Sequence, residues 1–175
     1  MYLALTTAAT RTETIVRIHD RRAAAESLFR ARAADEIDHP GGTLLAHLKR
    51  VAALLTEWGA DSDIQLAGLC HAAYGTDGFG AALLALEERT LLAETIGETA
   101  EALVYLYASC DREQTYPALR AFMEITAANE LDVVRHNDEL SRLHGAGLAK
   151  LFINAASHLS VSAGTAWAAH QTTAA

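Results

Sequence analysis

Two histidines on apolar helical stripes are the residues of this chain whose types and spacing could do chemistry. His47 recurs at helical spacing with apolar neighbours on the same face: Leu44, Leu48, Val51, Leu54 and Trp58. His71 lies near the middle of a segment that is apolar on opposite helical faces. A buried imidazole needs polar partners, because an unpaired polar group costs free energy in a core. A metal ion held between the histidines is one such partner.

Two more residues are candidate metal ligands, each with a structural alternative. His39 either adds a third imidazole or sets the turn before Pro40. Asp111 follows a helical segment that begins at Glu98, and it either binds the metal or pairs with a neighbouring arginine such as Arg112. Imidazole and carboxylate ligands suit Zn, Fe, Mn or Ni. A divalent ion of this kind activates a bound water or polarises a phosphoryl or carbonyl oxygen.

Candidate catalytic groups stand next to these ligands. His71 itself is one. The Tyr74 hydroxyl either donates into a cavity or is satisfied inside the core. Asp77 follows on a glycine-rich turn, where it is a candidate general base or substitute carboxylate ligand. Asn129 is an unusual choice for a helix interior, and its amide bonds either to the site or to backbone.

The elements that must position these residues are predicted to be helices. The chain has 175 residues, enough for one domain with a sizeable core, and its 51% apolar residues are rich in alanine. We expect one all-α domain over residues 13–164, with a flexible leader (1–12) and a loosely determined tail (165–175). Caps and breakers predict about seven helices over residues 13–35, 43–59, 61–74, 81–96 (with a break near Glu87), 98–110, 117–136 and 138–162.

Composition narrows the function classes. The formal charge of −8 argues against nucleic acid or an anionic membrane as the main partner. No apolar run has transmembrane length and the start lacks the features of a signal peptide, so we expect a cytoplasmic protein with a small-molecule substrate. Cys70 and Cys110 give no disulfide framework. The alanine-rich first and last helices either form a homodimer face or complete the core.

The order of these motifs resembles the HD-domain superfamily of metal-dependent phosphohydrolases. The resemblance rests on a helix with an inward histidine (His47), an Ala-Gly-Leu-Cys-His segment (residues 67–71), an Ile-Gly-Glu-Thr-Ala-Glu-Ala-Leu-Val segment (residues 96–104) and the later Asp111. Trp58-Gly59 and the Ala67–Thr76 motif more closely resemble an uncharacterised bacterial family of small helical proteins, a domain of unknown function. The second resemblance covers roughly residues 39–112.

The HD resemblance implies specific roles. The first histidine of the superfamily matches His47, the histidine of its His-Asp doublet matches His71, and its late aspartate matches Asp111. The aspartate of the doublet has no equivalent, because Ala72 follows His71. Since that carboxylate would bridge two metal ions, we expect a mononuclear site of His47, His71 and Asp111, with His39 as a fourth candidate.

Three functions remain open. The first is a metal-dependent hydrolase of a small molecule, a phosphoester being one substrate class. The second is an iron-dependent oxygenase or a metal-assisted lyase or cyclase. The third is a non-catalytic HD-like module that binds a ligand or a protein.

Overall fold

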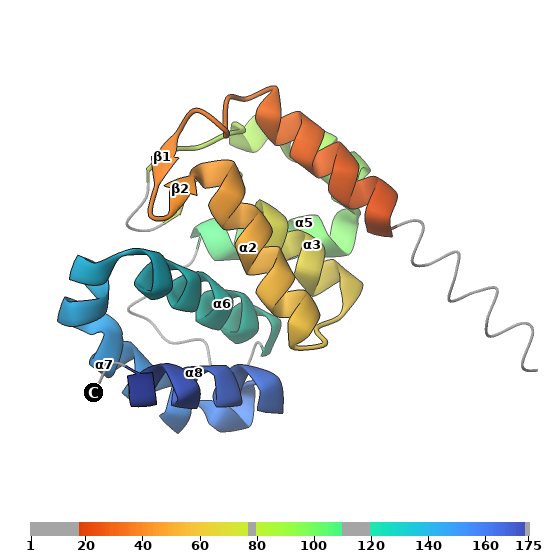
Figure 1. Ribbon diagram of the computed structural model, residues 1–175. Coiled ribbons are helices and arrows are strands. Elements are labelled where there is room, and N and C mark those ends of the chain that lie inside the picture. The colour runs from red at the N-terminus through yellow and green to blue at the C-terminus, as the bar shows by residue number, and fades with distance from the viewer. Residues whose placement is uncertain (1–17, 77–79, 110–119, 174–175) are drawn as a thin grey trace, which may run out of the picture.

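The computed structural model confirms the all-α class and the single domain. It describes residues 18–76, 80–109 and 120–173, which form eight α-helices and a two-stranded hairpin (Figure 1). The first helix covers residues 18–30 of the described part. Turns over residues 31–36 then lead to β1 (Asp38–His39) and β2 (Gly42–Thr43), which pair antiparallel.

Helices α2 and α3 form the centre of the first half. They are α2 (Leu44–Glu57) and α3 (Ser62–Cys70), and the chain continues through the short helix η1 (Leu86–Glu88), α4 (Arg89–Ile96) and α5 (Glu98–Ser109). Helix α3 packs against both α2 and α5, which explains why its second half, from Leu66 to Cys70, is buried on all sides.

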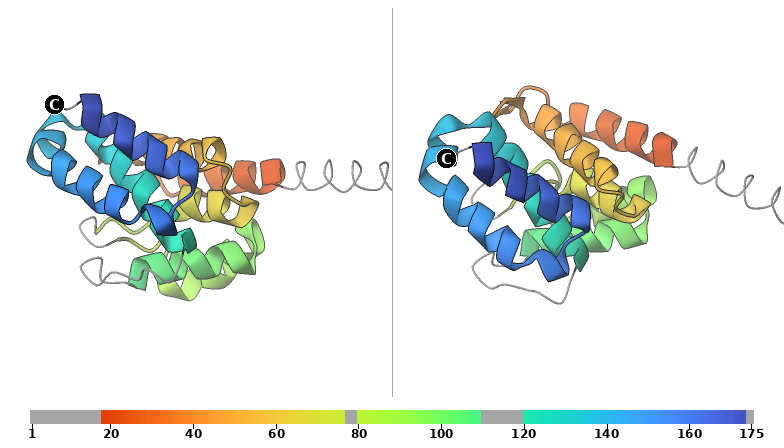
Figure 2. Two further views of the ribbon diagram at one scale, coloured as in Figure 1. Left: turned by 90° about the horizontal axis from the view of Figure 1, so that it is seen from below. Right: turned by 60° about the horizontal axis from the view of Figure 1, so that its bottom comes forward.

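Helix α6 (Arg120–His136) joins the first half to the second. It packs against α2 on one side and against α7 (Asp138–Asn154) and α8 (Val161–Thr173) on the other, with the short helix η2 (Ala156–His158) between the last two (Figure 1). Figure 2 shows α7 and α8, in blue, side by side at one side of the molecule. The position of α6 matters because it brings polar side chains to the histidines of the first half.

The start of α2 fixes the direction of His47. Thr43 caps the helix, its hydroxyl accepting a hydrogen bond from the Ala46 amide at 3.3 Å. The hairpin turn before it needs Gly41, whose φ is +77°. From this cap the apolar stripe points inward and His47 is 1% exposed, as the sequence predicts.

Three predicted helices have different bounds in the structure. The first ends at residue 30 instead of 35, and the backbone then turns, with Ala33 at φ +60°. Helix α3 ends at Cys70, so His71 is its C-cap and residues 71–74 are a turn. Among the described residues after this turn, helical structure begins at Leu86, because the Leu83 and Leu84 amides donate to the Ala73 carbonyl instead of to a helix.

Residues 165–173 of the predicted loose tail belong to a helix, and the predicted seventh helix (138–162) ends earlier than expected. The structure corrects the prediction here: α7 ends at Asn154, and α8 runs from Val161 to Thr173. Trp167 on α8 is fully buried, stacks on Phe152 at 4.7 Å and donates its indole N–H to the Ala127 carbonyl at 3.1 Å. Tertiary contacts of one tryptophan therefore order a segment that has little local signal.

None of the helices in the described residues is long and apolar enough to cross a membrane.

Candidate functional site

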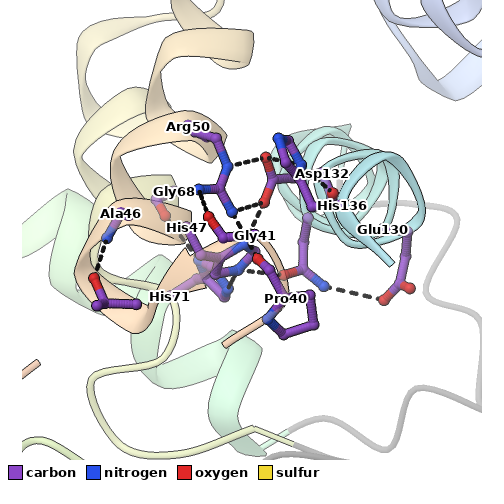
Figure 3. A network of polar contacts seen from close by, with 12 residues as sticks. Pro40, Gly41, Ala46, His47, Arg50, Gly68, His71, Glu130, Asp132 and His136 are labelled. Carbon is purple, nitrogen blue, oxygen red and sulfur yellow. Dashed lines mark hydrogen bonds and ion pairs between the residues drawn. The ribbon is translucent and has the colours of Figure 1, made fainter. Parts of the chain in front are cut away.

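His47 and His71 meet inside the protein, between α2, the end of α3 and α6 (Figure 3). Their Nε2 atoms lie 3.4 Å apart and their rings are edge-to-face, with centroids 5.2 Å apart. Both side chains are almost completely buried, at 1% and 2% exposure. The two histidines singled out from the sequence thus form one site.

The other nitrogen of each ring already has an acceptor. His47 Nδ1 donates to the Asp132 carboxylate at 2.7 Å, and His71 Nδ1 donates to the Gly68 carbonyl at 2.8 Å. In a neutral imidazole with hydrogen on Nδ1, Nε2 is a lone pair. With both rings in this form their Nε2 lone pairs face each other, and a cation between them, either a proton or a metal ion, would make the contact favourable.

Asp132 orients His47 and is itself held by an arginine. Arg50 forms a two-pronged ion pair with its carboxylate, with Nε to Oδ1 at 2.7 Å and Nη2 to Oδ2 at 3.0 Å. The same guanidinium donates to the Pro40 and Gly41 carbonyls, which ties the hairpin turn to α6. Burial alone would raise the pKa of Asp132, but the hydrogen bonds from His47 and Arg50 outweigh it and lower the pKa below its ordinary value.

Asn129 completes the site one turn before Asp132 on α6. Its Oδ1 lies 3.0 Å from His47 Nε2, while its Nδ2 donates to Glu130 Oε1 at 3.0 Å. The contact with Glu130 fixes which end of the amide faces the histidine. Of the two roles that the sequence left open for Asn129, the structure therefore supports the one at the site.

His39 joins the cluster through its ring face. Its imidazole stacks on that of His47, with centroids 4.0 Å apart and an interplanar angle of 22°. Burial, and secondarily the neighbouring His47, lower the pKa of His39 to about 4. At neutral pH this ring is uncharged and covers one side of His47.

Tyr74, a predicted catalytic group, forms a hydrogen bond with Glu101. Its hydroxyl donates to Glu101 Oε1 at 2.9 Å, and the buried Glu101 carboxylate also receives Arg89 Nε at 2.6 Å and Nη2 at 2.8 Å. Burial is the main cause that raises the pKa of Tyr74, and the bond to Glu101 adds to it. Tyr74 thus links the end of α3 to α5.

Two predicted site residues, Asp77 and Asp111, lie outside the described residues, as does Cys110. Ala72, which replaces the expected aspartate, is 2% exposed and packs in the apolar core. The position that would carry a second-metal carboxylate is therefore apolar, and the mononuclear site stays a prediction.

Two important residues of the site were missed in the sequence. In the sequence, Arg50 and Asp132 look like exposed charges on amphipathic helices. In the structure, Asp132 is only 2% exposed. The available signal was the spacing of Asn129 and Asp132, since polar residues three apart in a helix share a face. Pairing that face with His47 requires knowing that α2 packs on α6, which local sequence does not reveal.

The spacing of the two Nε2 atoms is compatible with two ligands of one metal ion. Two nitrogens bound to a tetrahedral ion at about 2.0–2.1 Å lie about 3.3–3.4 Å apart. The Nε2 atoms of His47 and His71 have this separation. In the described residues no three His, Cys, Asp or Glu side chains form a group that could hold a metal. Within this part of the chain, Asn129 Oδ1 lies 3.0 Å from His47 Nε2 and is a candidate third donor.

Comparison with known proteins gives a match over part of the chain but no activity. Residues 28–112 match a family described as a domain of unknown function (DUF6817). The match includes His39, His47 and His71 and ends before α6, which supplies Asn129 and Asp132. Searches found no match among curated proteins or among solved structures. The likeness to the HD superfamily stays a prediction.

Proposed function

We propose that this protein is a metal-dependent hydrolase of a small molecule, with one divalent ion bound by His47, His71 and Asn129. One observation carries the proposal: two Nε2 atoms face each other at 3.4 Å while both Nδ1 atoms donate to fixed acceptors. Metal-bound histidines characteristically donate their second nitrogen to a carboxylate or a backbone carbonyl. His47 and His71 use one acceptor of each kind.

Each residue around the proposed centre has a definable task. Asp132 keeps the hydrogen of His47 on Nδ1, and Arg50 holds Asp132 in place through two contacts. Gly68 does the same for His71 through its carbonyl. These partners fix the tautomers and aim both lone pairs at one point, so little reorganisation is needed when an ion binds.

The metal ion, when bound, would activate a water molecule and polarise an oxygen of the substrate. Three ligands from the described residues leave coordination positions for water and substrate, as in catalytic zinc sites. Asp111 is a further proposed ligand and Asp77 a proposed general base. A phosphoester is the substrate class that the HD resemblance implies, and the mixed imidazole and amide donors accept Zn, Fe, Mn or Ni.

Elemental analysis of protein purified without chelator tests the proposal. We expect one ion per chain, loss of that ion in His71→Ala, and retention in the control variant His158→Ala, whose side chain is exposed. A panel of phosphoesters then measures metal-dependent hydrolysis. If no ion copurifies and added Zn, Mn or Fe gives no thermal shift, the proposal is wrong. Oxygen consumption by anaerobically Fe(II)-loaded protein would instead favour the oxygenase alternative.

A specific observation also favours a second candidate, a non-catalytic ligand-binding or protein-binding module. The side chains of His47, Asn129, Asp132 and Arg50 form a continuous hydrogen-bonded network, in which a shared proton can replace a metal ion between the histidines. Ala72 fits this candidate, since it removes a carboxylate that phosphohydrolase chemistry uses. Ligand binding that survives in His71→Ala would support this candidate over the hydrolase.

A further inference from the structure

A second polar group is buried far from the histidines along α6. Glu124 is 2% exposed, and its Oε1 atom has no hydrogen-bond partner among the described residues. Its other oxygen makes only an ion pair with Arg120 Nε at 3.7 Å, beyond hydrogen-bond distance. A buried acceptor without a donor is costly, and such groups in folded proteins call for an explanation.

A cavity of about 420 Å³ adjoins Glu124 and provides room for a missing donor. It lies where the turn between α2 and α3 meets the starts of α6 and α8. Its lining includes the apolar side chains of Trp58 and Ile64 and the polar side chains of Asp61, Arg120, Glu124 and Ser160. The volume is in the range of small-molecule sites.

We propose that this cavity binds the ammonium group of a small organic amine, with Glu124 as its anchor. An ammonium group brings three hydrogen-bond donors and no acceptor, which is the complement of a carboxyl oxygen without a donor. Asp61 adds a second carboxylate at the more exposed part of the lining. The site is independent of the proposed metal centre.

The charges of the lining favour a cation over an anion. Asp61 and Glu124 outnumber Arg120, and the whole chain carries a formal charge of −8. The Arg120 side chain is 67% exposed and does not hydrogen-bond to Glu124, so its ion pair contributes little that an amine would have to replace. Trp58 and Ile64 offer an apolar wall for the carbon chain, and an indole face also attracts cations.

An organic cation fits better than a metal ion. A metal would need further ligands, and within the described residues no cluster of three His, Cys, Asp or Glu side chains could hold one. A single buried carboxyl oxygen and a distant second carboxylate are sufficient for an ammonium group, which hydrogen-bonds instead of coordinating.

Nuclear magnetic resonance on the full ¹⁵N-labelled chain tests the proposal, with 1,4-diaminobutane as the probe. We expect a saturable shift of the Trp58 indole N–H signal, which Trp58→Phe identifies against the signal of Trp167. The matched neutral probe, 1,4-butanediol, has the same chain length and should give no saturable shift. Equal binding of the diol, or no response to millimolar diamine, would overturn the proposal.

Variants of the two carboxylates locate the binding. Glu124→Gln keeps the side-chain size and should weaken diamine binding by about tenfold or more, because it removes the charged acceptor. Asp61→Asn lies at an exposed position, so it tests the site even if the Glu124 variant fails to fold, and it should weaken binding severalfold. Arg120→Ala should leave binding unchanged or tighter. Wild-type affinity in both carboxylate variants would contradict the proposal.

Discussion

At the scale of single residues, the site is defined by which nitrogen of each imidazole carries hydrogen. Asp132 and the Gly68 carbonyl accept from Nδ1 of His47 and His71, so both Nε2 atoms are left as facing lone pairs. In a core histidine, one ring nitrogen more commonly donates to an acceptor while the other accepts from a neighbouring donor. A proton or a metal ion between the two rings would satisfy both lone pairs.

Changing Asp132 to asparagine should weaken metal binding while preserving shape. The amide can donate to His47 Nδ1, which moves the ring hydrogen to Nε2 and blocks the lone pair. We expect metal affinity to fall about 10- to 100-fold, the usual effect of losing such a partner. Competition against a chromophoric chelator measures it, with Asp138→Asn at the exposed start of α7 as the control. Equal affinities of the Asp132 variant and wild type would contradict the role assigned to Asp132.

Substitutions of Asn129 should either raise or lower the metal affinity. If its Oδ1 is a ligand, Asn129→Asp should raise metal affinity because a carboxylate binds a divalent ion more strongly than an amide, and Asn129→Ala should lower it. The same titration ranks the three proteins. An alanine variant that binds as tightly as wild type would exclude Asn129 from the coordination sphere.

The sequence predicted part of this site for a physical reason. His47 and His71 stand out because imidazoles among leucines and alanines break an apolar pattern, and the structure brings them together. Asp132 and Arg50 do not stand out, since charged residues are normal on an amphipathic helix. Their burial arises only when α6 packs on α2, which is a tertiary event.

At the scale of elements, the distance between the two histidines depends on how closely α2 and α3 cross. Gly68 lies at this crossing, where an added Cβ would clash with Leu55 Cδ1. Leu55 is fully buried and cannot move aside cheaply. A small residue is therefore required where the His71 helix approaches the His47 helix.

Gly68→Ala should thus destabilise the protein although alanine favours helices. We expect a loss of about 1–3 kcal/mol from overpacking. The matched variant is Gly147→Ala on α7, where no atom lies within 4 Å of the added Cβ and the helix should gain about 0.5–1 kcal/mol. Urea unfolding followed by circular dichroism measures both. Stabilisation by both substitutions would show that the crossing can open without cost.

The ion pair between the partly exposed Arg89 of α4 and the buried Glu101 of α5 should make stability depend on pH in acid. Hydrogen bonds from Arg89 are the main cause that lowers the pKa of Glu101, against the opposing effect of burial. The unfolded chain therefore takes up a proton near the ordinary value of 4.5, before the folded chain does. The stabilising contribution is complete above that pH and is lost as the pH falls through the lower, folded pKa.

Glu101→Gln should remove this part of the pH dependence. We expect a smaller decrease in the free energy of unfolding below pH 4.5 than in wild type, and a loss of about 1–3 kcal/mol at pH 7. Glu98→Gln, exposed on the same helix, is the control. Parallel stability curves for Glu101→Gln and wild type between pH 3 and 7 would contradict the assignment.

Elements with strong local signals were predictable and elements formed by tertiary contacts were not. Thr43, with its capping hydroxyl, marked the start of α2 correctly. Residues 81–85 look helical in sequence, yet hydrogen bonds from Leu83 and Leu84 to Ala73 hold that part of the chain in a non-helical path. Helix α8 was missed because its order comes from Trp167, whose partners are 15 and 40 residues away.

At the scale of the whole molecule, the proposed centre is assembled from two parts of the chain. His47 and His71 lie inside the segment that matches a domain of unknown function, whereas Asn129 and Asp132 come from α6 beyond it. Helix α6 is held from behind by α8, since Trp167 donates to the carbonyl of Ala127, two residues before Asn129. Stability of the second half and affinity at the site should therefore be coupled.

Trp167→Ala tests this coupling. The substitution should cost about 3–5 kcal/mol, because it removes a large, fully buried side chain. Metal affinity should also fall, since loosening α6 shifts Asn129 and Asp132 away from His47. Thermal unfolding with and without Zn or Mn measures both effects: bound metal stabilises the folded chain in proportion to its affinity, so the metal-induced shift should be smaller in the variant.

The control is Val161→Ala at the start of the same helix, where the side chain is 88% exposed and both quantities should stay at wild-type values. An equal metal-induced shift in Trp167→Ala and wild type would mean that His47 and His71 set the affinity without α6. That outcome would reduce the centre to the segment shared with the family. Loss of the shift would instead make α6 and its support by α8 part of the binding site, because only a rigid second half can hold an amide oxygen 3.0 Å from His47 Nε2.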